Sequence, residues 1–107
     1  MLNYILDKIN CQNFKNNVIE CRNDVEKQRW YITFQFENGY GLSLVKELYP
    51  MGEDDMWSVT LLENDEKGRL QEAGWRISQV LNTAQVLMDE NVLEELKYVN
   101  SLRPNCL

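Results

Sequence analysis

The dipeptide Asn38-Gly39, flanked on both sides by alternating apolar residues, is the feature that most constrains the fold of this chain. Asn-Gly favours a two-residue type I′ turn, because both central positions of that turn need positive φ. The segment 30–36 before it is rich in β-branched and aromatic residues, and 40–45 resumes the alternation after it. The sequence therefore predicts an antiparallel hairpin whose core face carries Trp30, Ile32, Phe34, Phe36, Leu42 and Leu44.

Further strand signals extend this hairpin into a sheet. Residues 56–62 alternate in the same way, which predicts a third main strand with Trp57, Val59 and Leu61 facing the core. Shorter signals at 18–21 and 69–75 predict additional short strands. The remaining tryptophan, Trp75, is also expected to fill the core.

Helical periodicity appears at both ends of the chain. Leu2, Ile5, Leu6 and Ile9 mark one face of an N-terminal helix. Helical spacing also begins at Ile77 and runs to Met88 and beyond, into a last helix that we expect Asp89 to cap. The whole chain, 1–107, is therefore predicted to form a single α+β domain, in which N- and C-terminal helices pack on one face of an antiparallel meander of three to five strands.

The charge of the chain is concentrated in one segment. The 107 residues carry a net charge of −6, and residues 51–72 contain seven acidic and two basic residues. Most of these acids form two clusters, Glu53, Asp54 and Asp55 in one and Glu63, Asp65 and Glu66 in the other. This pattern argues against direct nucleic-acid binding and against binding to anionic membranes, since both require clustered Lys and Arg.

Most site chemistries find little support. The chain has no histidine, and Cys11, Cys21 and Cys106 form no CxxC pair, which does not favour zinc. A calcium loop beginning at Glu63 fails at its fifth and twelfth positions, Lys67 and Gly74. We expect no cofactor, no metal and no enzymatic activity. A small hydrolase using paired carboxylates is the least favoured alternative, and Cys21 is expected to be a small buried residue rather than a nucleophile.

Aromatic residues near the acidic clusters suggest a recognition surface. Tyr40 and Tyr49 are expected on or near the outer face of the sheet and the loop beside the first cluster, and Tyr supplies contact area at a low entropic cost. With Glu53, Asp54, Asp55, Glu63, Asp65 and Glu66 they form the predicted partner-binding set. An ordinary solvated sheet face is the alternative.

The block Phe36-Glu37-Asn38-Gly39-Tyr40-Gly41-Leu42-Ser43 resembles the F-x-N-G-Y-G-x-S hairpin of small accessory proteins from tailed phages and prophages, and the resemblance extends over residues 31–102. It departs from the pattern at Ser78-Gln79, where those proteins carry an acidic pair. The resemblance implies a phage source and a related fold. Small acidic phage proteins often act by stoichiometric binding to a host machine.

Together these observations predict a non-catalytic phage accessory protein that binds a host or phage protein with a basic surface. One version is an inhibitor of a host defence nucleoprotein, of anti-CRISPR or anti-restriction type, that competes for its nucleic-acid-binding surface. The alternative is a virion or assembly component that forms homo-oligomers, and a homodimer is a further expected partner. With no signal peptide and no membrane-spanning run, the expected location is the cytoplasm of an infected bacterium.

Overall fold

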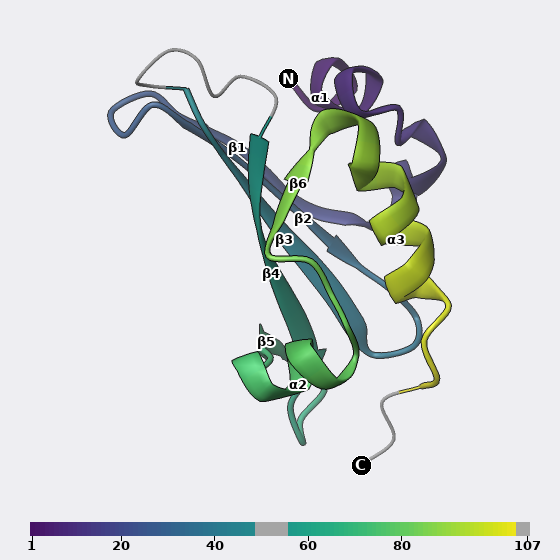
Figure 1. Cartoon of the computed structure of the whole chain (residues 1–107). Helices are drawn as coiled ribbons and strands as arrows, with labels where there is room; N and C mark the ends of the chain where they lie inside the picture. The colour runs from purple at the N-terminus through teal and green to yellow at the C-terminus, as the bar shows by residue number, and fades with distance from the viewer. Residues whose placement is uncertain (49–55, 105–107) are drawn as a thin grey trace.

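The predicted hairpin is present in the computed structural model, which describes residues 1–48 and 56–104 (Figure 1). It joins β2 (Arg29–Gln35) to β3 (Tyr40–Glu47). The register places Ile32 opposite Leu44 and Phe34 opposite Leu42, and all four side chains are fully buried. The hairpin and the direction of its core face are therefore confirmed.

The turn of this hairpin differs from the predicted type I′ turn. Three residues form the loop, because the Phe36 N–H donates to the Tyr40 carbonyl, and Gly39 has a φ of 90° whereas Asn38 does not have positive φ. The Asn38 side chain accounts for the difference. Its Oδ1 accepts from the Tyr40 N–H at 3.1 Å, and its Nδ2 donates to two carbonyl oxygens at the end of the last helix, those of Val99 at 2.8 Å and Leu102 at 3.2 Å.

Within the described residues, the sheet has six antiparallel strands. Its order is β1 (Val18–Asp24), β2, β3, β4 (Met56–Asn64) and β5 (Leu70–Glu72), and β6 (Val86–Met88) also pairs with β4. β5 pairs with the end of β4 and β6 with its beginning, so both lie along the same edge. The sheet therefore contains one strand more than the predicted maximum.

The prediction of helical structure from Ile77 to Met88 is wrong for most of this range, which lies between β5 and the end of β6. Only Trp75–Val80 is helical (α2), Asn82 then adopts a left-handed φ of 57°, and Val86–Met88 form a strand. In β4, Ser58 and Leu62 are four residues apart. Their partners, Val86 in β6 and Glu72 in β5, are fourteen residues apart. The segment that contains α2 therefore inserts ten residues between two strands that pair with the same edge of β4. In β6, pairing with this edge outweighs the helical spacing of the sequence.

The other helices cover one face of the sheet, as predicted (Figure 1). They are α1 (Leu2–Ile9), the 3₁₀ turns η1 (Gln12–Asn17) and η2 (Asp89–Asn91), and α3 (Val92–Asn100). The core between the two layers is formed by Ile5, Leu6, Ile9, Cys11, Phe14, Ile32, Phe34, Phe36, Leu42, Leu44, Trp57, Val59, Leu61, Val92, Leu96 and Val99. The α+β class is confirmed.

Candidate functional site

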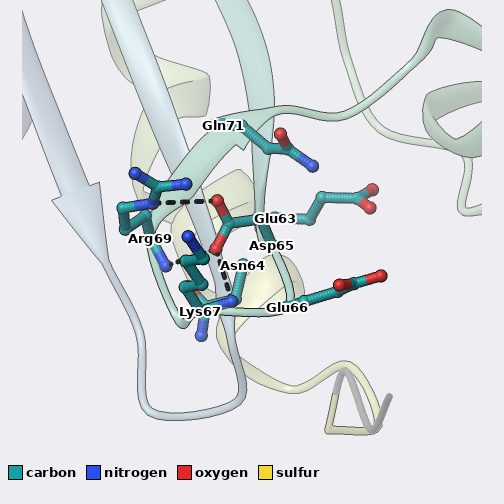
Figure 2. A pocket seen from close by; sticks show the side chains of 7 residues that line it. All are labelled: Glu63, Asn64, Asp65, Glu66, Lys67, Arg69 and Gln71. Carbon is teal, nitrogen blue, oxygen red and sulfur yellow. Dashed lines mark hydrogen bonds and ion pairs between the residues drawn. The ribbon is translucent and has the colours of Figure 1, made fainter.

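Three of the predicted acidic residues meet at the turn between β4 and β5. Glu63, Asp65 and Glu66, called the acidic turn below, border a hollow of about 380 Å³ at one end of the sheet (Figure 2). The hollow is lined by Glu63, Asn64, Asp65, Glu66, Lys67, Arg69 and Gln71. The tight turn forms because Gly68 supplies a φ of 79°, which L side chains rarely adopt.

Asp65 holds this turn together. Its Oδ1 accepts hydrogen bonds from the backbone N–H groups of Lys67 and Arg69 at 2.8 and 2.9 Å, and its Oδ2 lies 3.1 Å from Arg69 Nε. The hydrogen bond from the Arg69 N–H is the largest cause that lowers the pKa of Asp65. A lowered pKa is the opposite of what a general acid requires, so Asp65 has a structural role in the turn.

The two glutamates of the acidic turn are oriented differently. Figure 2 shows the Glu63 and Glu66 side chains extending to one side, away from the pair formed by Asp65 and Arg69. Glu66 is exposed and Glu63 is half-buried. These two carboxylates are therefore the ones that the turn presents outward.

Replacing Asp65 with Asn is expected to reduce stability most at neutral pH. The folded pKa of Asp65 is lowered, so its contribution is complete above the unfolded pKa of about 3.9 and is lost as pH falls through the folded value. Urea unfolding at pH 7 and at acidic pH should show the D65N defect shrinking on acidification. Glu66→Gln, an exposed change in the same turn, is the control, and an equal Asp65→Asn defect at both pH values would contradict the assignment.

A second hollow, of about 330 Å³, adjoins the acidic turn. It is lined by Tyr40, Arg76, Ile77, Val80 and Leu81. The strand register connects the two hollows, because Tyr40 lies directly opposite Glu63 in the pairing of β3 and β4. The predicted site residue Tyr40 is half-buried and packs against the core, on the face that carries the helices rather than on the outer face.

The helix beside this hollow exposes its apolar side chains. The exposed fraction is 63% for Trp75, 38% for Ile77 and 82% for Val80, and these three residues are called the α2 patch below. The buried residue of α2 is Ser78, whose hydroxyl is hydrogen-bonded to that of Thr83. The prediction that Trp75 fills the core is therefore wrong, since Trp75 is exposed and Leu81, just after α2, packs against the core instead.

Sequence reasoning missed the α2 patch, although a signal was present. Trp75, Ile77 and Val80 are spaced i, i+2 and i+5, which does not place all three on one helical face. A short helix with this spacing cannot bury all three against one neighbour. Ile77 and Val80 are exposed on one side of α2 and Trp75 on another, and large apolar side chains left exposed in this way are typical of interaction sites.

The remaining predicted residues of the site, Tyr49, Glu53, Asp54 and Asp55, lie outside the described residues. The described part of the site is therefore the acidic turn with Tyr40, which lines the second hollow together with Ile77 and Val80 of α2. Figure 1 shows α2 beside the end of the sheet where β4 turns into β5.

A buried ion pair joins Lys46 of β3 to Asp89, the first residue of η2. Lys46 is 1% exposed, and its Nζ is 3.3 Å from Asp89 Oδ1, which also accepts a 2.6 Å hydrogen bond from Trp57 Nε1. Lys8 Nζ lies 3.3 Å from the other Asp89 oxygen. The predicted role of Asp89 as a helix cap is wrong, because its carboxylate neutralises Lys46 and makes no capping hydrogen bond.

The two cysteines that the structure describes behave as packed side chains. Burial raises the pKa of the Cys11 thiol to about 12 and also raises the pKa of the half-buried Cys21. Residues 1–48 and 56–104 contain no group of three or more His, Cys, Asp or Glu side chains placed to bind a metal ion. Within the same residues, the helices are too short and too polar to cross a membrane.

Comparison of the chain with protein-family models, with curated proteins and with solved structures gave no match. The resemblance to phage accessory proteins therefore stays a prediction that depends on the hairpin sequence. What the chain binds has to be argued from its own surface.

Proposed function

We propose that this chain is a non-catalytic phage accessory protein that binds another protein stoichiometrically through the end of the sheet where the acidic turn meets the α2 patch. The observation that carries the proposal is the exposure of Ile77 and Val80 in a hollow that Tyr40, the strand partner of Glu63, also lines, together with the exposure of Trp75 on the same helix. Apolar and aromatic anchors surrounded by charged residues are the usual composition of a protein-binding surface. The partner is a protein, because a nucleic acid would require a basic surface.

The charge of the acidic turn indicates the chemistry of the partner. Carboxylates at the rim of an apolar contact accelerate association with a basic surface and disfavour acidic ones. A host defence nucleoprotein offers such a surface where it holds nucleic acid. We therefore include in the proposal that the chain inhibits a nucleoprotein of this kind, in the host cytoplasm, by competing with its nucleic acid.

Charge reversal tests the role of the acidic turn. The affinity-tagged chain is used to capture proteins from a bacterial lysate, and each captured protein is purified and titrated against the chain. The variant E63K/E66K is expected to bind about tenfold more weakly at low salt, and the difference should shrink as ionic strength rises. The matched control is E26K/E94K, which changes the net charge equally at exposed positions away from the turn.

The α2 patch is tested in the same titration. Trp75→Ser removes the exposed aromatic side chain and should weaken binding at every salt concentration, because an apolar contact is not screened. Equal affinity of wild type, E63K/E66K and W75S for every captured partner would overturn the proposal. For the inhibitor version, the purified partner should also lose bound nucleic acid as the chain is added, and undiminished nucleic-acid binding would contradict that version alone.

A further inference from the structure

The edge of the sheet opposite the acidic turn is formed by β1. Among the residues that the structure describes, β1 pairs with β2 on one side, and its other side has no strand partner. An unpaired edge presents backbone N–H and C=O groups that can pair with another strand. Ile19, within the strand, and Val25, just after it, are 56% and 75% exposed.

We propose that β1 pairs with β1 of a second copy of this chain, in an antiparallel register centred on Cys21. Two copies related by a twofold axis perpendicular to the sheet would then share one continuous sheet. This goes beyond the proposed function, because it concerns the opposite edge and needs no other protein.

The charges along β1 select this register. Paired residues must lie on the same face, so a symmetric pairing in the middle of the strand can be centred on Glu20, Cys21 or Arg22. The register centred on Glu20 is unfavourable because Glu20 would lie opposite Glu20 of the other copy. The register centred on Arg22 is also unfavourable, because Arg22 would lie opposite Arg22 and Glu20 opposite Asp24. Only the register centred on Cys21 places Glu20 opposite Arg22, and symmetry makes this favourable pair occur twice.

The orientation of these side chains fits such a pairing. In the β1–β2 register Glu20 lies opposite Thr33 and Arg22 opposite Tyr31, on the outer face, whereas Cys21 lies opposite Ile32 on the core face. Both charged residues are exposed, and the Arg22 guanidinium is held 4.1 Å above the Tyr31 ring. The charged pair would form on the outer face and the two Cys21 side chains would meet on the other.

The dimer would present two acidic turns and two α2 patches. β1 forms one edge of the sheet, and β5 and β6 form the other, where the proposed binding surface lies. Pairing through β1 therefore leaves that surface uncovered. A bivalent arrangement strengthens binding to a partner that offers two sites.

Charge swapping tests the pairing. The mass of the purified chain in solution is measured by sedimentation over a concentration series. The wild type should dimerise, and E20R and R22E should each weaken the dimer about tenfold or more by placing like charges opposite each other. The double variant E20R/R22E restores opposite charges and should recover the dimer. Wild type that stays monomeric at all concentrations, or single reversals without effect, would overturn the proposal.

Cross-linking tests the register independently of the charges. In a chain carrying Cys106→Ser, oxidation should join two copies through Cys21, and Cys21→Ser should abolish the link. Moving the thiol with C21S/N23C should also prevent it, because in this register residue 23 does not lie opposite residue 23 of the other copy. Equal cross-linking from positions 21 and 23 would contradict the register. E63K/E66K should not change the dimer, which separates this test from that of the proposed function.

Discussion

Asp89→Ala is expected to cost about 3–5 kcal/mol of the free energy of unfolding. The Lys46 side chain is 2% exposed, and Asp89 is the carboxylate that neutralises it. Removing that carboxylate leaves a buried ammonium without its counter-charge and also takes the hydrogen-bond acceptor from Trp57 Nε1. A loss of this size is a large part of the stability of a small domain, about 5–15 kcal/mol in total.

A double-mutant cycle distinguishes the buried charge from simple loss of packing. Lys46→Met keeps most of the side-chain volume and should cost far less than Asp89→Ala, because Asp89 would keep its ion pair with Lys8 and its hydrogen bond from Trp57 Nε1. The double variant K46M/D89A should therefore be more stable than D89A alone. Urea or thermal unfolding supplies the values, with the exposed neighbour Glu90→Ala as control. A double variant less stable than D89A would show that the ion pair is not the cause.

The elements that sequence reasoning predicted well are those in which local preference and burial agree. Alternation in β2, β3 and β4 determines which side chains face the core, and Trp57, Val59 and Leu61 are buried as expected. The α1 helix is similar, since its apolar stripe packs on the sheet. In each case the residues of one short segment are enough to predict the element and the face that it buries.

The errors occur where a distant part of the chain decides the local structure. The turn at Asn38 is not type I′, because the Asn38 side-chain amide donates hydrogen bonds to carbonyl oxygens at the end of α3. Val86–Met88 become a strand because β4 has an edge to pair with. Continuing the alternation of Leu42 and Leu44 does place Lys46 on the core face, and a lysine there requires a carboxylate, but no sequence pattern identifies Asp89 as that carboxylate.

The candidate site was accessible from the sequence only in part. The acidic turn was found from composition, because Glu63, Asp65 and Glu66 are close in the chain. The separate roles of these residues depend on geometry, since Asp65 is bound to Arg69 while the two glutamates extend outward. The α2 patch could not be found from the sequence, because no sequence pattern indicates that Ser78 is the buried residue of α2 while Trp75 is exposed.

Gly41→Ala is expected to destabilise the domain by about 2–3 kcal/mol, and to lower the Tm by roughly 10–20 °C. A Cβ at position 41 would lie 2.4 Å from the Phe34 carbonyl oxygen and 3.3 Å from Leu70 Cδ1. The nearer atom belongs to the backbone of β2, so the two central strands would have to separate. This is why the hairpin requires glycine just after Tyr40.

Gly74→Ala is the matched control for this prediction. Gly74 has a φ of −60°, which any residue adopts, and a Cβ there would contact nothing within 4 Å. Because Gly74 is the N-cap residue of α2, where Ala is less favourable than Gly, its substitution should cost up to about 1 kcal/mol, still less than Gly41→Ala. Thermal unfolding of the two variants under the same conditions compares them directly. Similar Tm values for G41A and G74A would mean that β2 and β3 can separate at little cost, and the close approach at Gly41 would then not constrain the hairpin.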